Sequence, residues 1–293
     1  MTLLTSTPAR SRPLNPHLFI WQRLGAGTSL LFLFITAVLT LAPIAYALTT
    51  SLRTPAESFT LPPQWIPVSP DWSNYQAVFT TVPFGAYLLN SGIVTVSIVI
   101  GQLITSSLAG YAFARFDFPG KDALFWLILA TMMIPLQATI IPVFVEISRA
   151  GLADTRASLV ITAVGTAFGT FLLRQYFKTI PNEYEEAALV DGAGHLTIFW
   201  SVYLPLVQPG LAVLAVLTFN SHWNEFLRPL VFLKSVDKFT LPLGLVSLQG
   251  YLGTGSISVV LAGVILSLIP VLAVYLLGQR YLIEGIMLGG LKT

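Results

Sequence analysis

A polar loop between two long apolar segments contains the stretch Glu186-Ala187-Ala188-Leu189-Val190-Asp191-Gly192, and Val202-Tyr203-Leu204-Pro205 follows it closely. The rest of the chain is strongly apolar. Of its 293 residues, 55% are hydrophobic and 10% are charged, and the mean hydropathy is +0.77. Soluble domains contain about 25% charged residues, so a soluble core could not absorb this much apolar surface. We therefore expect a membrane protein in which this loop faces water.

Six apolar runs are long enough to cross about 30 Å of hydrocarbon, which requires roughly 20 helical residues. They cover residues 28–48, 87–113, 123–145, 158–177, 206–223 and 258–278. The expected fold is therefore all-α, a polytopic membrane protein with six transmembrane helices. Residues 1–27 form a basic leader without an evident cleavage site, and residues 28–293 form the transmembrane domain.

The distribution of basic residues predicts that both termini are cytoplasmic. With the leader inside, nine of the fifteen Lys and Arg residues lie inside and six outside, as the positive-inside rule favours. The loop at about 181–205 then faces the cytoplasm, and the connections 51–83 and 224–257 lie outside. A net charge of +2 indicates no nucleic-acid-binding face.

Several kinds of catalytic and metal site are absent from the sequence. The chain has no cysteine, and its only Gly-Lys pair, Gly120-Lys121, does not belong to a phosphate-binding loop. The three histidines, His17, His195 and His222, are too scattered to suggest a metal site. We therefore expect no catalytic residue, no metal and no cofactor in this chain.

The middles of the apolar runs contain neutral amides but no ionisable residue of the kind that ion-coupled carriers use. Because amides both donate and accept hydrogen bonds, such a lining suits a neutral, hydroxyl-rich cargo. The candidate translocation-path residues are Asn90, Gln102, Gln137, Asn220, Trp223 and Asn224. The alternative is that the amides satisfy one another between helices.

The polar loop is predicted to form two short helices joined by a turn. Asn182 is expected to cap the first helix, with Glu185 three residues on in a capping-box-like arrangement. Gly192 and Gly194 are expected to end this helix, and a second helix begins near His195. Small alanines would let another surface approach closely, while Glu186 offers it a carboxylate.

The spacing of this loop resembles the EAA loop of bacterial ABC importer permeases: Glu-Ala-Ala, three residues, Gly, nine residues, an aliphatic residue, one residue, Leu-Pro. Val202 takes the aliphatic position, where Ile is common. A chance match at the fixed positions is on the order of 10⁻⁴. Further stretches resemble the carbohydrate-uptake permeases, and most of all the maltose-type second permease of a pair. They are residues 116–121, 132–135, 141–142, 151–155, 223–227, 279–285 and 289–293. The last residue of the family's tail is often Gly, whereas here it is Thr293.

This resemblance implies a type I ABC importer permease in the bacterial cytoplasmic (inner) membrane. Its implied partners are a second permease subunit, two cytoplasmic ATPase subunits that bind ATP and Mg²⁺, an extracytoplasmic solute-binding protein, and a sugar or sugar-like solute. The implied ATPase-coupling residues are Glu186, Ala187, Ala188, Asp191, Gly192, Leu204 and Pro205. An ion-coupled secondary transporter and a membrane enzyme are the alternatives. The lack of midplane charges disfavours the first, and the lack of a catalytic constellation disfavours the second.

Overall fold

The structure, a computed structural model, describes residues 16–54, 57, 66–67, 69–250 and 255–290; of these, the side chains of 16–27 and 282–290 are not described. The described residues form helices joined by turns and short loops, with no strand among them. The expected all-α class is therefore confirmed. Most of residues 1–27, the tip of the first outer connection, the turn at 251–254 and the last three residues of the tail lie outside the described residues.

Three of the six predicted runs are single helices that are long and apolar enough to cross a membrane. They are α1 (Pro16–Ser51), α3 (Phe84–Arg115) and α14 (Ile257–Gly290). α1 already begins at Pro16, before the expected start at 28. α1 and α14 continue through an internal proline, Pro43 and Pro270 respectively.

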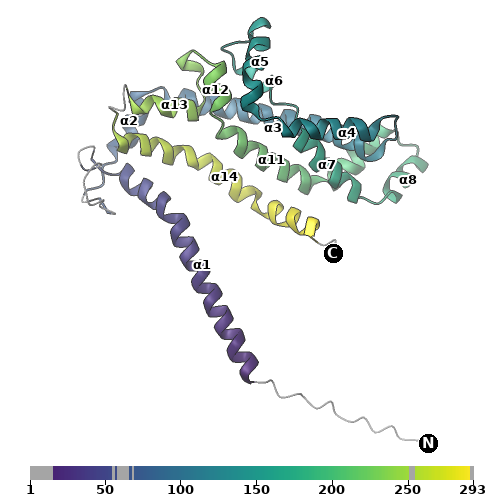
Figure 1. The fold of residues 1–293 in the computed structure, drawn as a ribbon, viewed down its shortest axis with the longest axis horizontal. Helices are drawn as coiled ribbons and strands as arrows, with labels where there is room; N and C mark the ends of the chain where they lie inside the picture. The colour runs from purple at the N-terminus through teal and green to yellow at the C-terminus, as the bar shows by residue number, and fades with distance from the viewer. Residues whose placement is uncertain (1–15, 55–56, 58–65, 68, 251–254, 291–293) are drawn as a thin grey trace, which may run out of the picture.

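The third predicted run, 123–145, is not one continuous helix. It consists of α4 (Lys121–Ala130), the 3₁₀ turn η2 (Thr131–Met133) and α5 (Leu136–Arg149), and the two parts meet at 101°. Pro135 explains the bend, because it lacks an N–H and forces the residue before it into an extended conformation. Ile134 has that conformation, with φ −87° and ψ 114°. Figure 1 shows α5 standing away from α4.

The fourth run is also interrupted, whereas the fifth corresponds to a single helix that bends away from the segment before it. The fourth divides into α6 (Arg156–Ile161) and α7 (Ala167–Thr179). The fifth, α11 (Gln208–Trp223), meets the preceding segment at 75°. That segment comprises α9 (His195–Ile198), the π-helical turn η3 (Phe199–Tyr203) and α10 (Leu204–Leu206). Within the described residues, three single helices are long and apolar enough to cross a membrane. The number of spans rises to as many as five if each of the two bent helix pairs is counted as one span. The α6 and α7 pair supplies the remaining predicted run.

The short helices occupy opposite ends of the molecule (Figure 1). At one end lies α8 (Glu183–Val190). The other end carries α2 (Ser73–Thr81), α12 (Leu227–Phe232), η4 (Val236–Lys238), α13 (Leu241–Val246) and η5 (Ser247–Gln249). The loops predicted to share a side of the membrane therefore do lie at the same end.

α3 is the central helix and packs against both α7 and α11, while α14 covers α11 and contacts α1. The approach of α3 to α7 is close at Gly110. A Cβ atom there would lie 2.9 Å from the backbone nitrogen of Arg174 and 3.0 Å from the Cβ of Leu173. Only glycine fits this contact without displacing backbone.

Candidate functional site

The α8 loop presents its motif residues to solvent. Glu186 and Ala187 are exposed and Ala188 is half-buried, and none of residues 183–190 is buried. Large apolar side chains are exposed as well, with Val190 at 88% and Leu196 at 71%. Val190 and Leu196 therefore place apolar side chains on the surface of this loop, beside the motif residues.

Gly192 ends α8 in the way that the sequence predicted. Its φ is +78°, in the left-handed region. The N–H of Gly192 donates to Leu189 O (3.0 Å) and the N–H of Ala193 donates to Ala188 O (2.9 Å). These bonds satisfy the last carbonyls of the helix. Gly194 has an ordinary φ of −77° and precedes α9, which begins at His195.

The predicted capping box is wrong. Asn182 has helical backbone angles and makes no capping bond to α8. Instead its Oδ1 accepts a hydrogen bond from Nη1 of Arg115, the last residue of α3. Charge-assisted bonds are stronger than neutral ones, so the guanidinium takes the amide oxygen that the cap would have used. A second guanidinium nitrogen, Nη2, donates to the carbonyls of Phe177 and Ile180 at the end of α7, both at 2.5 Å.

The residue beside the motif, Glu185, turns inward. Its Oε2 accepts a hydrogen bond of 2.6 Å from the hydroxyl of Tyr203, which is fully buried. Tyr203 occupies the variable position of the Val-Tyr-Leu-Pro part of the motif. The next two residues differ in exposure: Leu204 is half-buried and Pro205 is exposed. Asp191 is exposed beside Gly192.

Asn90 and Trp223, two of the candidate path residues, use their side-chain N–H groups in hydrogen bonds to backbone carbonyls of the same chain. The amide nitrogen of Asn90 donates to the carbonyls of Asp237 (2.8 Å) and Phe239 (3.0 Å). The indole of Trp223 donates to Ser267 O at 3.2 Å and stacks on Phe219 with ring centroids 5.3 Å apart. Both residues are buried.

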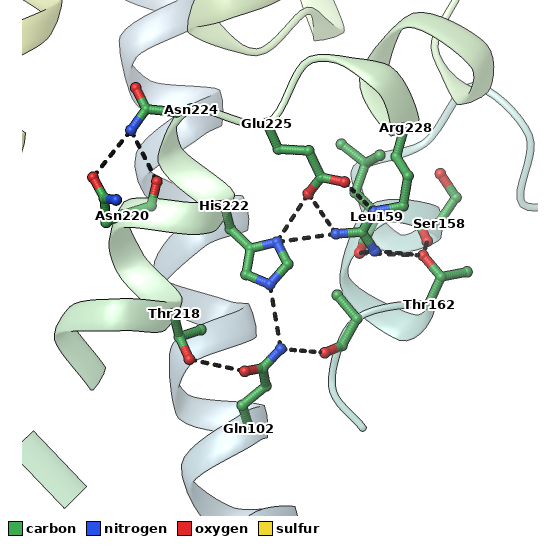
Figure 2. Close-up of polar contacts among 11 residues, drawn as sticks. Gln102, Ser158, Leu159, Thr162, Thr218, Asn220, His222, Asn224, Glu225 and Arg228 are labelled. Atoms are coloured by element: carbon green, nitrogen blue, oxygen red, sulfur yellow. Dashed lines mark hydrogen bonds and ion pairs between the residues drawn. The ribbon is translucent and has the colours of Figure 1, made fainter. Parts of the chain in front are cut away.

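Gln102 joins three segments (Figure 2). Its Nε2 donates to Ala163 O (2.7 Å) and to Nε2 of His222 (3.2 Å), and its Oε1 accepts from Thr218 (2.8 Å). The carbonyl of Ala163 fixes which amide atom is nitrogen, because two oxygens would repel at that distance. Each atom of this amide is therefore used within the chain.

Gln137, Asn220 and Asn224 are exposed. Asn224 donates from Nδ2 to the backbone oxygen of Asn220 at 2.9 Å and to its Oδ1 at 3.2 Å. These three amides can therefore reach solvent or a neighbouring molecule, unlike Asn90 and Gln102.

A cavity of about 390 Å³ lies between α3, α7 and α11. Hydroxyl groups, an aromatic ring and an imidazole contribute to its walls. The lining residues are Gln102, Thr166, Phe168, Leu217, Thr218, Ser221 and His222.

A buried ion pair follows α11, and sequence reasoning missed it. Arg228 donates from Nε and Nη2 to the carboxylate of Glu225, with side chains 6% and 16% exposed. Figure 2 shows this pair reaching His222, whose Nδ1 lies 2.9 Å from Glu225 Oε2, and Thr162 on the α6 side. The i, i+3 spacing of Glu225 and Arg228 was the available signal.

This pair is ionised. Burial acts to raise the pKa of Glu225, but hydrogen bonds from His222 and Arg228 and the Arg228 charge outweigh it and lower the pKa to about 2. The His222 ring lies between the pair and Gln102, with Nδ1 2.9 Å from Glu225 Oε2 and 3.0 Å from Arg228 Nη2, and with Nε2 3.2 Å from Nε2 of Gln102. His222 thus continues the network from α12 to α3.

No group of three or more His, Asp or Glu side chains in the described part of the chain could hold a metal ion.

Comparison with known proteins identifies the family. Residues 102–285 match the model of the binding-protein-dependent transport system inner membrane component. The chain is 34% identical over 264 residues to the sn-glycerol-3-phosphate transport system permease protein UgpE of Yersinia pestis bv. Antiqua, covering 88% of this chain and 94% of that protein. It is also 34% identical over 265 residues to the diacetylchitobiose uptake system permease protein NgcG of Streptomyces coelicolor, covering 87% and 85%.

A solved structure gives the same result. The crystal structure of a bacterial ABC transporter involved in the import of the acidic polysaccharide alginate matches with a TM-score of 0.80 and 30% identity. The match covers 94% of this chain and 99% of that one. Fold, loop geometry and relatives agree, and the chain belongs to the family of binding-protein-dependent ABC importer permeases of the inner membrane.

Proposed function

We propose that this chain is the permease subunit of an ATP-driven importer for sugars or sugar-like solutes, coupled to two ATPase subunits through α8. The observation that carries the proposal is the Glu-Ala-Ala segment of α8, in which Glu186 and Ala187 are exposed and which ends at Gly192 in a left-handed conformation. ATP and Mg²⁺ would be bound by the ATPase subunits, and this chain would supply no catalytic group. Both of its termini would lie in the cytoplasm, on the same side as α8.

The coupling surface would consist of Glu186, Ala187, Ala188, Asp191 and Gly192, with Leu204 and Pro205 behind them. Exposed Val190 and Leu196 add apolar area that a groove on an ATPase would bury. ATP-driven closure of the ATPases would then displace α8 and change which side of the membrane the permease opens to.

A second permease subunit is supported by the position of α1. The most apolar 18 residues of α1, which lie within residues 28–51, include no buried residue. The helix that α1 contacts most is α14. α1 extends away from the other helices in Figure 1. The second permease would cover part of this apolar surface, and lipid would cover the rest.

The cargo proposal rests on chemistry and on the relatives. Those relatives are permeases for sn-glycerol-3-phosphate and for diacetylchitobiose, both rich in hydroxyl groups. The cavity between α3, α7 and α11 has hydroxyls at Thr166 and Ser221 and an exposed ring at Phe168. Together with exposed Gln137, Asn220 and Asn224, these groups suit a polyhydroxylated solute that an extracytoplasmic binding protein delivers.

One experiment separates this function from an ion-coupled carrier. Uptake of radiolabelled diacetylchitobiose and of sn-glycerol-3-phosphate would be measured in cells with a proton uncoupler present while ATP is maintained. We expect uptake of at least one of them to continue, because ATP is the energy source. Collapse of that uptake under these conditions would support the secondary carrier. Purification of the chain without bound ATPase subunits would contradict the coupling proposal directly.

A further inference from the structure

We propose that Arg115, Tyr203 and Glu185 form a latch that makes α8 move as one body with the end of α3. The proposal rests on the coupling function above and assigns to it three residues that lie outside the fixed positions of the motif. These are positioning residues, since they act on the coupling helix and not on cargo or nucleotide.

The need for a latch follows from how little apolar packing α8 has. The helix is 8 residues long and none of its residues is buried. Isolated helices of this length are unstable in water. A force applied to α8 by an ATPase would therefore tilt or unwind it unless polar contacts tie it to the helices behind it.

Arg115 supplies the first of these contacts. As the last residue of α3, it donates to Asn182 directly before α8, and to the carbonyls of Phe177 and Ile180 at the end of α7. Its guanidinium also lies 4.6 Å from the centroid of the Tyr203 ring, within cation–π range. One side chain thus joins α3, the end of α7, the start of α8 and η3.

The hydrogen bond from Tyr203 to Glu185 supplies the second contact. At 2.6 Å it joins the first turn of α8 to η3, and the Tyr203 ring lies in a buried aromatic cluster. The Tyr203 ring centroid is 5.2 Å from that of Tyr111 on α3 and 6.0 Å from that of Phe177 on α7. Displacement of Glu185 would therefore pull on a side chain that packs directly against α3.

Glu185 and Glu186 thus have opposite tasks. Glu186 is exposed and available to a partner, whereas Glu185 is half-buried and bonded inside the chain. The neighbouring Glu183 is exposed. It is a matched control for removal of a carboxylate from the same helix.

The direct test is a distance measurement in the complete transporter complex. The chain has no cysteine, so Tyr184→Cys on α8, an exposed residue outside the proposed coupling surface, and Leu108→Cys on α3 would carry the only two spin labels in this subunit. Pulsed electron paramagnetic resonance would compare the nucleotide-free complex with the complex trapped by MgATP and vanadate. We expect the label distance to be the same in both states of the otherwise unchanged chain. Tyr203→Phe, which removes only the hydroxyl, is expected to shift or broaden the distance on trapping.

A functional measurement accompanies it. Stimulation of ATP hydrolysis by the cognate solute-binding protein is expected to fall about tenfold in Tyr203→Phe and in Glu185→Ala, because each loses a hydrogen bond to a charged group. ATPase subunits should still co-purify with both variants. The double variant should be no worse than either single one, Glu185→Gln should recover part of the stimulation, and Glu183→Ala should match the unchanged chain.

The possible failures can be told apart. If the unchanged chain does not retain ATPase subunits, the proposed coupling function is wrong. If it retains them, but Tyr203→Phe keeps both the distance and the stimulation of the unchanged chain, the latch is wrong.

Discussion

Arg228 and Glu225 form an ion pair that is largely removed from solvent, and the same guanidinium reaches across to α6. Its Nη1 donates to Leu159 O (3.3 Å) and to Thr162 Oγ1 (3.1 Å). Arg228 lies on α12, and Glu225 lies in the short segment between α11 and α12. The pair therefore connects this region to the end of α6, where the fourth apolar run is interrupted. A charged group at the edge of the membrane region is retained here because both charges and their hydrogen bonds are satisfied.

Removal of one partner of this pair should destabilise the chain. We expect Arg228→Met to lower the free energy of unfolding by about 3–5 kcal/mol, because a buried carboxylate is left without its cation. The double variant Glu225→Gln/Arg228→Met should recover much of this loss. Thermal unfolding in detergent would measure both. The exposed pair of Arg149 and Glu146 provides the control, and Arg149→Met should change stability by less than about 1 kcal/mol.

Asp154 should make part of the stability depend on acidic pH. Hydrogen bonds from Ser235, from the N–H of Lys234 and from Lys238 hold the pKa of Asp154 well below its ordinary value of 3.8. A lowered pKa stabilises the fold above pH 3.8, and this contribution decreases as the pH falls from 3.8 through the lowered pKa.

The measurement compares the unchanged chain with Asp154→Asn at pH 6 and pH 3. Asparagine also tolerates the left-handed φ of +57° at this position, so the backbone need not change. We expect the variant to unfold at a lower temperature at pH 6, and the difference to shrink at pH 3. A difference that grows on acidification would mean that the sign is wrong. Asp117→Asn, at a fully exposed side chain, is the control.

Gly192→Ala should impair coupling while leaving membrane insertion intact. An alanine at φ +78° costs roughly 1–2 kcal/mol, which would distort or fray the end of α8. We expect weaker retention of ATPase subunits on purification, by about 5- to 30-fold if the whole cost falls on docking. Gly194→Ala is the matched control, because Gly194 has an ordinary φ and open space around its Cβ position. Equal retention by both variants would argue against the geometric role of Gly192.

Gly110→Ala should loosen the contact between α3 and α7. Its Cβ would meet backbone atoms of α7 that cannot move aside, so we expect a loss of about 1–3 kcal/mol in unfolding free energy. Gly92→Ala lies in the same helix with open space at its Cβ, and there the better helix propensity of alanine should leave stability equal or higher. Denaturation of the two variants in the same detergent would show whether they separate in this order.

Much of the architecture could be read from the amino-acid order, because it depends on local properties. Apolar composition over runs of about 20 residues indicates membrane helices wherever they lie in space. Gly192 ends α8 because glycine, which lacks a Cβ, adopts the left-handed backbone conformation at no steric cost. The spacing from Glu186 to Pro205 identified the family for the same reason, since it lies within one short segment.

Contacts between distant residues could not be predicted in this way. Arg115 takes the oxygen of Asn182, 67 positions away, only because α3 ends beside the start of α8. Asn90 is bonded to carbonyls 147 and 149 positions away, and Glu185 turns toward Tyr203 rather than toward a partner. Local sequence thus determined which segments are helical, which are apolar and which form turns. Tertiary packing decided which polar groups meet, because their free energy depends on partners and burial that only the assembled helices provide.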